Sequence, residues 1–129
     1  MKNIFKPGDQ KVFKRTVTAS DTASFDSGTV HPVYATFALA RDAEWCCRLF
    51  VLEIKDDDEE GIGTMVSVNH LSSALINQEV IIIATVKLIL NNQIICTYTA
   101  YVNEREIANG EQAQKILKKE KLEKIFNAL

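Results

Sequence analysis

The chain has 129 residues and a formal net charge of −2, with 47% hydrophobic and 25% charged residues. This length suits one domain with its own core, and the composition is that of a globular protein. We therefore expect a single domain over residues 1–129. The near-neutral balance lacks the basic footprint of nucleic-acid-binding proteins, so no nucleic-acid partner is expected.

The apolar runs and the cysteines predict where the protein resides. The longest apolar run, IIIATVKLIL, is interrupted by Lys87 and is too short to cross a bilayer, and the N-terminal MKNIFKPGD has no signal-peptide core. We expect no membrane partner and a cytoplasmic location. Cys46, Cys47 and Cys96 have no metal-ligand spacing and lie among apolar neighbours, which predicts free, buried thiols in a reducing compartment.

The first part of the chain contains one extended run between turns. Residues Pro7 to Asp9 carry a turn signal, and KVFKRTVT at Lys11 to Thr18 predicts a first strand. The small and polar run from Ala19 to Thr29 predicts a surface loop or a loose turn of helix, and loops of this kind often cover a binding cleft.

The stretch from Thr36 to Ile54 is the one around which we expect the fold to be organised. No Gly or Pro interrupts it, and it is apolar around nearly its whole circumference, which predicts a helix enclosed by protein. Pro32 favours an extended backbone at His31, so the helix begins later, with Thr36 as the expected N-cap. The acidic run at Lys55 to Glu60 lacks the calcium-loop pattern and predicts a solvated turn.

Extended runs after the helix are expected to wrap it. GIGTMVSVNH at Gly61 to His70 predicts a strand, in which Gly63 marks either a bulge or the close approach of a ligand or backbone segment. The runs from Glu79 to Leu90 and from Gln93 to Asn103 predict two further strands. Their two-residue Asn-Asn connection suits a tight hairpin.

The C-terminal segment permits two interpretations. Apolar residues at helical spacing predict an amphipathic helix from about Gln112, whereas a sheet that wraps a helix favours a last strand from Glu106 to Leu117 with a helical tail. We choose the second interpretation. The lysines of the tail predict a solvated helix face, because glutamates are interspersed with them. The expected fold class is α+β, with a curled antiparallel sheet around one long buried helix.

Glu44 and His70 are the candidates for chemistry. Glu44 is a carboxylate on the predicted buried helix, and His70 ends a strand expected to pack against that helix, so the two suit a general-base or nucleophile pair. However, Arg41 and Arg48 lie three residues before and four after Glu44, which equally suits an ion pair on the helix surface. A histidine at a strand end also suits a structural role, so the residues alone leave these interpretations open.

Two segments carry a resemblance to a known family. VYATFALARDAEW, followed after the acidic turn by GTMVSVNH, resembles the fluoroacetyl-CoA thioesterase type of hot-dog protein. That type has an aromatic-Ala-Thr before its central helix, Glu-Trp eight residues after the Thr, and a Gly-Thr strand that ends in His. Thr36, Glu44, Gly63 and His70 fall on the matching positions.

The resemblance implies a hot-dog fold, in which a five-stranded antiparallel sheet surrounds one long helix and a short helix ends the chain. It implies edge-to-edge pairing into a homodimer, or a dimer of dimers, with acyl-CoA sites at the interface. Glu44 and His70 would activate water or attack the thioester, Thr36 would position them or the substrate, and Gly63 N–H would bind the oxyanion. No metal and no separate cofactor are expected, because coenzyme A is part of the substrate.

The spacing of Thr36 and Glu44 has a geometric consequence. Eight residues of continuous helix span about 12 Å along the axis, so the two side chains cannot hydrogen-bond directly. Either Thr36 lies in a turn ahead of the helix and folds back, or the site combines side chains from two chains or through the bound substrate. We hypothesise that one site combines side chains of two chains.

The predicted function is hydrolysis of a small acyl-CoA thioester to free acid and CoA. The alternatives are a non-catalytic acyl-CoA-binding hot-dog module and an enoyl-thioester hydratase, because a fold does not determine a function. The loop before Val33 offers only Phe25 as a bulky aromatic residue, so the fluoroacetyl selectivity of the resembling type is not expected to carry over. The identity of the acyl group is left open.

Overall fold

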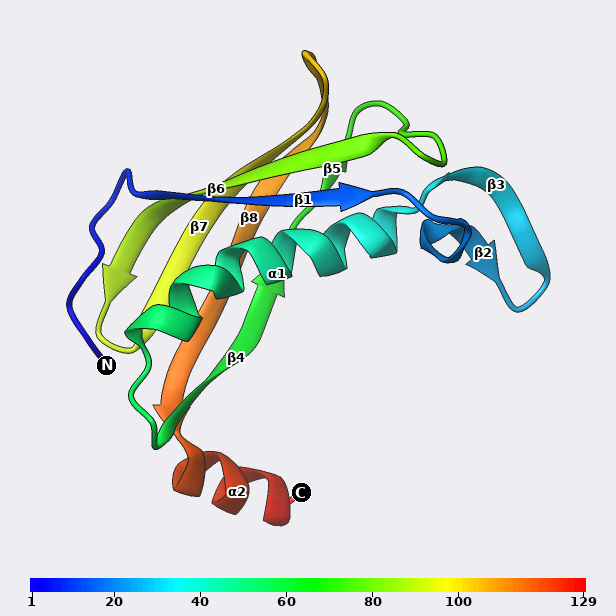
Figure 1. Cartoon of the computed structure of the whole chain (residues 1–129). Helices are drawn as coiled ribbons and strands as arrows, with labels where there is room; N and C mark the ends of the chain where they lie inside the picture. Colours follow the sequence, from blue (N-terminus) through cyan, green and yellow to red (C-terminus); the bar gives the residue numbers. More distant parts are fainter.

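A curled antiparallel sheet bends around helix α1 (Thr36–Ile54), and a shorter helix, α2 (Lys119–Asn127), extends beyond the end of the sheet (Figure 1). The computed structural model describes all residues, 1–129. The strands, in chain order, are β1 (Gln10–Thr16), β2 (Thr22–Phe25), β3 (Gly28–Tyr34), β4 (Glu59–Val66), β5 (Asn69–His70), β6 (Glu79–Leu90), β7 (Gln93–Val102) and β8 (Arg105–Lys118).

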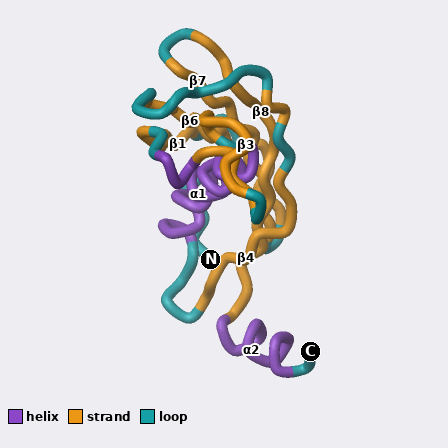
Figure 2. The backbone as a smooth tube through the Cα atoms, turned by 90° about the vertical axis from the view of Figure 1, so that its right-hand side faces the viewer, coloured by secondary structure: helices purple, strands orange, loops and turns teal.

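The main sheet has five strands in the order β1-β6-β7-β8-β4, and the short β5 pairs separately with β8. Figure 2 shows α1 lying within the curve of this sheet. Strand β4 is an edge strand, so its outer side has no partner within the chain. Such an edge presents unpaired backbone groups to another strand.

The predicted strands that begin at Glu79 and Gln93 are confirmed, whereas the strand predicted from Gly61 to His70 is interrupted after Val66 and is divided between β4 and β5. Strands β6 and β7 are joined by the expected two-residue turn, in which Asn91 adopts a φ of 56°, a conformation that Asn tolerates. Strand β8 runs to Lys118 before α2 begins, which confirms the interpretation of Glu106 to Leu117 as a strand. Pairing with β7 on one side and with β4 and β5 on the other overrides the helical spacing of its apolar residues.

The prediction of a surface loop or a loose turn of helix from Ala19 to Thr29 is right for its first three residues and wrong for most of the others. This segment contains a single 3₁₀ turn, Ala19–Asp21, and most of the hairpin formed by β2 and β3 at the start of α1 (Figure 1). Gly28 permits the reversal because its φ is 106°. The two strands are short and, apart from one bridge between Val33 and Leu75, pair only with each other. Their sequence lacks the regular alternation that identifies a half-buried strand.

The prediction of a helix enclosed on all sides is wrong for the single chain. Leu39 and Phe50 are fully buried against the sheet, whereas Phe37, Trp45 and Leu52 are 50%, 40% and 41% exposed. The sheet covers one side of α1, and a stripe of apolar side chains on the other side faces solvent.

The core forms between α1 and the inner face of the sheet. Its largest members include Tyr34, Phe50, Ile82 and Tyr98, all at most 2% exposed. The three cysteines lie in this core as free thiols, as predicted. Neither helix combines the length and apolar content needed to cross a membrane.

Candidate active site

His70 is positioned by the break between β4 and β5. After Val66 the chain leaves its regular pairing with β8. The interrupted segment is held in place at Ser67, whose carbonyl accepts a 2.6 Å hydrogen bond from Tyr98 Oη. Pairing then resumes at β5, where His70 lies opposite Ala108. Strand β8 therefore fixes the backbone of His70.

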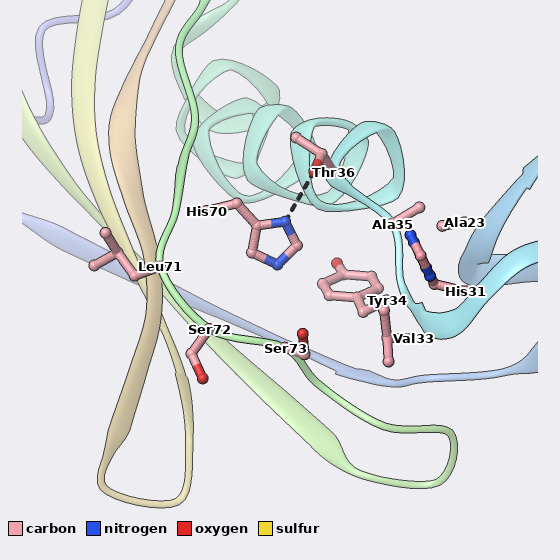
Figure 3. Close-up of a pocket in the computed structure, with 10 residues that line it drawn as sticks. All are labelled: Ala23, His31, Val33, Tyr34, Ala35, Thr36, His70, Leu71, Ser72 and Ser73. Atoms are coloured by element: carbon pink, nitrogen blue, oxygen red, sulfur yellow. Dashed lines mark hydrogen bonds between the residues drawn. The ribbon is translucent and has the colours of Figure 1, made fainter.

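Thr36 begins helix α1 next to His70. The predicted N-cap is wrong by one residue, because Ala35 has the extended N-cap backbone and Thr36 is the first helical residue. Backbone N–H groups of Tyr34 and Ala35 donate to Ala74 and Asp21 carbonyls at 2.8 Å and hold this start in place. The Thr36 hydroxyl is thus free of a capping role, and Oγ1 lies 2.9 Å from His70 Nδ1 (Figure 3).

A pocket of about 360 Å³ opens beside this pair. It lies between β3, the start of α1 and the segment after β5, and Figure 3 shows the residues that line it. They are Ala23, His31, Val33, Tyr34, Ala35, Thr36, His70, Leu71, Ser72 and Ser73. The pocket therefore combines hydroxyl groups and two imidazoles with apolar wall residues.

The His70 ring has one nitrogen without a partner. Nδ1 faces Thr36, whereas Nε2 is buried and has no hydrogen bond. Burial lowers the pKa of His70 below its ordinary value of 6.5, and the nearby backbone of Ser72 offsets only part of this effect. The imidazole is accordingly neutral at neutral pH and has the protonation state of a base.

Glu44 is held at a second position, against β4 and β8. Its Oε1 accepts a 3.0 Å hydrogen bond from Gln112 Nε2, and Gln112 Oε1 accepts a 2.9 Å bond from Gln114 Nε2. The carboxylate also lies over Gly63, where a Cβ atom would overlap Glu44 Oε1. Gly63 therefore provides the space that the Glu44 side chain occupies. The predicted bulge is confirmed, because the β4–β8 register shifts between Gly63 and Met65.

The predicted surroundings of Glu44 need two corrections. Its side chain is exposed in the single chain, because it projects from the side of α1 that the sheet leaves open. The ion-pair interpretation is also wrong: Arg41 binds Asp21 and Asp42, and Arg48 binds Glu60.

The candidate residues form two groups within one chain. Thr36 contacts His70, and Glu44 contacts Gln112 near Gly63, but no hydrogen bond joins Glu44 to His70. Thr36 and Glu44 belong to the same continuous helix, as the sequence predicts. No cluster of three or more His, Cys, Asp or Glu side chains has the arrangement of a metal site.

Sequence reasoning missed Gln112 and Gln114. The two amides are 1% and 2% exposed and occupy alternate positions of β8, so both face the helix. Polar residues at two core-facing positions of one strand are unusual, and this is the signal that identifies them.

Comparisons with known proteins show the family to which the chain belongs. A family model described as fluoroacetyl-CoA-specific thioesterase matches residues 17–120. A structure from Thermus thermophilus, described as a hypothetical protein of the thioesterase superfamily, is 34% identical with a TM-score of 0.91, covering 95% of this chain and 91% of that one. A search of curated proteins returned no match.

Two more distant structures share the fold. The fluoroacetyl-CoA thioesterase FlK is 17% identical with a TM-score of 0.89, and the alignment covers 98% of both chains. A hot-dog-like protein from Thermanaerovibrio acidaminovorans is 18% identical with a TM-score of 0.86, covering 95% of this chain and 90% of that one. The family match includes every candidate residue from Thr36 to His70. The chain therefore belongs to the fluoroacetyl-CoA-specific thioesterase family and is a thioester hydrolase with the hot-dog fold.

Proposed function

We propose that this protein hydrolyses the thioester of a small acyl-CoA to the free acid and coenzyme A, with Thr36, Glu44 and His70 as its catalytic residues. The 2.9 Å contact between Thr36 and His70 beside a pocket carries this proposal, because it leaves His70 Nε2 buried and unpartnered. Membership of a thioesterase family supports the same reaction class.

His70 acts as the base in the first step. Thr36 Oγ1 accepts a hydrogen bond from His70 Nδ1–H, which leaves the Nε2 lone pair free to take a proton from water. The resulting hydroxide attacks the thioester carbonyl carbon. When the C–S bond breaks, the CoA thiolate takes the proton back from the imidazolium, so the products are the acid, free CoA and neutral His70.

Glu44 and Gly63 act on the same carbonyl group. Gln112 holds Glu44 over the edge strand β4. In this position Glu44 acts either as a second base that activates water or as a nucleophile that attacks the thioester. Gly63 N–H stabilises the negative charge that develops on the carbonyl oxygen. A glycine suits this role because a side chain there would displace Glu44.

Two copies of the chain complete the site. The free edge of β4 supports pairing with a second β4, and exposed Phe37 on α1 and Met65 on β4 supply apolar surface that the partner would cover. In this homodimer the Thr36–His70 group of one chain works with the Glu44–Gly63 group of the partner. The separation of the two groups within one chain supports this assignment.

The reaction is tested by thiol release from a panel of acyl-CoA substrates. We expect thiol release with small acyl groups, lost in both Glu44→Gln and His70→Ala. Tight CoA binding without thiol release would instead identify a non-catalytic binding module. Loss of enoyl absorbance without free thiol would identify a hydratase.

The shared site is tested by mixing the inactive Thr36→Ala and Glu44→Ala proteins. After random exchange, half of the dimers are mixed and one of their two sites is intact, so about a quarter of wild-type activity should return. Native mass spectrometry of differently labelled chains measures the exchange. Complete exchange without recovered activity would contradict a site built from two chains.

A further inference from the structure

A second pocket, between β1 and α1, plays no part in the chemistry described above. It has a volume of about 510 Å³, within the range of small-molecule sites. The residues that line it are Phe13, Lys14 and Arg15 of β1 and Arg41, Asp42 and Trp45 of α1. We call it the β1–α1 pocket.

The side of this pocket that faces solvent is cationic. Its carboxylate, Asp42, is only 1% exposed, and Asp21 behind Arg41 is 4% exposed, whereas the Arg15 and Arg41 side chains are 35% and 51% exposed. The negative charges thus lie below the positive ones. Lys14 is exposed and forms no hydrogen bond or ion pair.

The buried carboxylates orient the two guanidinium groups without using all their donors. Asp42 accepts from Nε and Nη2 of Arg15 at 3.3 and 3.1 Å and from Nε of Arg41 at 3.0 Å, and Asp21 accepts from Arg41 Nη2 at 2.9 Å. Nη1 of each arginine has no partner. Two fixed guanidinium edges and a free ammonium group suit a phosphorylated ligand, because such donors recognise phosphate oxygens.

Aromatic rings line the same pocket. Trp45 is 40% exposed and is the only tryptophan of the chain, and the guanidinium carbon of Arg15 lies 5.5 Å from the centre of the Phe13 ring. An exposed indole next to cationic groups is the combination on which nucleobases stack while their phosphates are neutralised.

The β1–α1 pocket shares a wall with the proposed active site. Tyr34 lines the pocket that contains His70, and its hydroxyl donates a hydrogen bond to Asp42 of the β1–α1 pocket. Trp45 also directly follows Glu44 on α1. A ligand with a reactive end and a phosphorylated end can therefore use both pockets.

We infer that the β1–α1 pocket binds the phosphorylated adenine nucleotide half of coenzyme A, with the base on Trp45 and phosphates on Lys14, Arg15 and Arg41. This inference rests on the proposed acyl-CoA substrate. A free nucleotide has the same chemistry, so the experiment must distinguish the two sources.

Trp45 fluorescence reports directly on this pocket, because no other tryptophan contributes. We expect saturable quenching by CoA and by ADP, but none by pantetheine, with CoA binding more tightly than ADP. Lys14→Glu should weaken CoA binding about tenfold, as loss of one charge-assisted phosphate contact. Lys121→Glu on α2 makes the same change in net charge and should leave binding unchanged.

Calorimetry measures the stacking contribution in Trp45→Leu, where the fluorescent reporter is absent. We expect CoA affinity about tenfold lower than in the wild type. Absence of saturable quenching by CoA and ADP would overturn the inference. Equal weakening by Lys14→Glu and Lys121→Glu would also overturn it, because it would indicate only long-range charge. ADP binding equal to or tighter than CoA would identify a free-nucleotide site instead.

These outcomes are separable from failure of the proposed function. If CoA quenches Trp45 but no acyl-CoA is hydrolysed, the pocket assignment holds and the proposed reaction is wrong. If hydrolysis occurs, Lys14→Glu should raise KM for acyl-CoA and leave KM for the matching acyl-pantetheine thioester unchanged. Hydrolysis with no change in KM for acyl-CoA would show that the reaction is right and the pocket assignment wrong.

Discussion

Thr36 Oγ1 and His70 Nδ1 are 2.9 Å apart although 34 positions separate the two residues in the chain. Helix α1 begins at Thr36 because Ala35 is held by the Asp21 carbonyl, and His70 is fixed by the pairing of β5 with β8. The contact therefore joins the start of helix α1 to strand β5. It also leaves Nε2 as the only His70 nitrogen free for a substrate or water.

Removal of the Thr36 hydroxyl tests whether it orients His70. Thr36→Val keeps the shape of the side chain but loses Oγ1, so the His70 ring loses the partner that selects its tautomer. We expect kcat to fall about tenfold to a hundredfold with little change in KM. Thr36→Ser keeps the hydroxyl and should retain most of the activity. Equal losses in both variants would contradict an orienting hydrogen bond.

The pH dependence of the reaction should report the burial of His70. Burial lowers the pKa of His70 below 6.5, and only the neutral ring accepts a proton, so kcat/KM should fall on the acid side at a pH below 6.5. NMR titration of the ring, assigned by its loss in His70→Asn, should give the same midpoint. An acid limb at or above pH 6.5 would contradict a buried His70 as the base.

The same pKa shift predicts a change in stability. Because the folded His70 binds a proton less readily than the unfolded one, the unfolded chain takes up more protons as the pH falls below 6.5. The His70 contribution to the free energy of unfolding should therefore decrease through this window. Urea unfolding of the wild type and His70→Asn, compared at neutral and mildly acidic pH, isolates that contribution; an equal pH dependence of the two proteins would contradict it.

Local sequence signals predicted the parts of the fold that depend on local geometry. The helix from Thr36 to Ile54 has no Gly or Pro, and the Asn91 turn suits positive φ, so both were predictable. The hairpin of β2 and β3 was not, because its strands are short and, apart from Thr22 and Tyr34 at their ends, have no fully buried residues. The exposure of Glu44 was also missed, since an apolar helix pattern does not say whether the chain's own sheet or a second copy covers each side.

The candidate site was predictable in its residues and only partly in its contacts. Thr36, Glu44, Gly63 and His70 stand out by residue type and family spacing, but the partner of each side chain depends on tertiary arrangement. Gln112 was missed for this reason: an amide is neither acid nor base, and only the packing of β8 against α1 brings it to Glu44.

Gln112 should position Glu44 without touching the substrate. Gln112→Leu removes the hydrogen bond to Oε1, so the Glu44 carboxylate is free to turn into solvent. We expect kcat about tenfold lower and KM nearly unchanged, with a loss of stability of about 1–3 kcal/mol because buried Gln114 Nε2 loses its acceptor. Gln112→Glu should be worse, since it places a second carboxylate against Glu44. A kcat of wild-type size in Gln112→Leu would contradict a positioning role.

Gly63 and Gly110 should respond differently to the same added methyl group. A Cβ at Gly63 would overlap Glu44 Oε1, the end of a flexible side chain that can move aside, so Gly63→Ala should fold normally but displace the carboxylate. A Cβ at Gly110 would overlap the backbone carbonyl of Ser67, which Tyr98 holds in place, so Gly110→Ala should lose at least about 2 kcal/mol of stability.

Thermal unfolding and kcat measured on both variants separate these effects. Gly63→Ala should keep a Tm near that of the wild type and lose about a hundredfold in kcat, because Glu44 is moved and the oxyanion donor is crowded. Gly110→Ala should show a clearly lower Tm. If Gly63→Ala keeps its activity, the space above Gly63 serves packing alone, and Glu44 does not need the position that the glycine gives it.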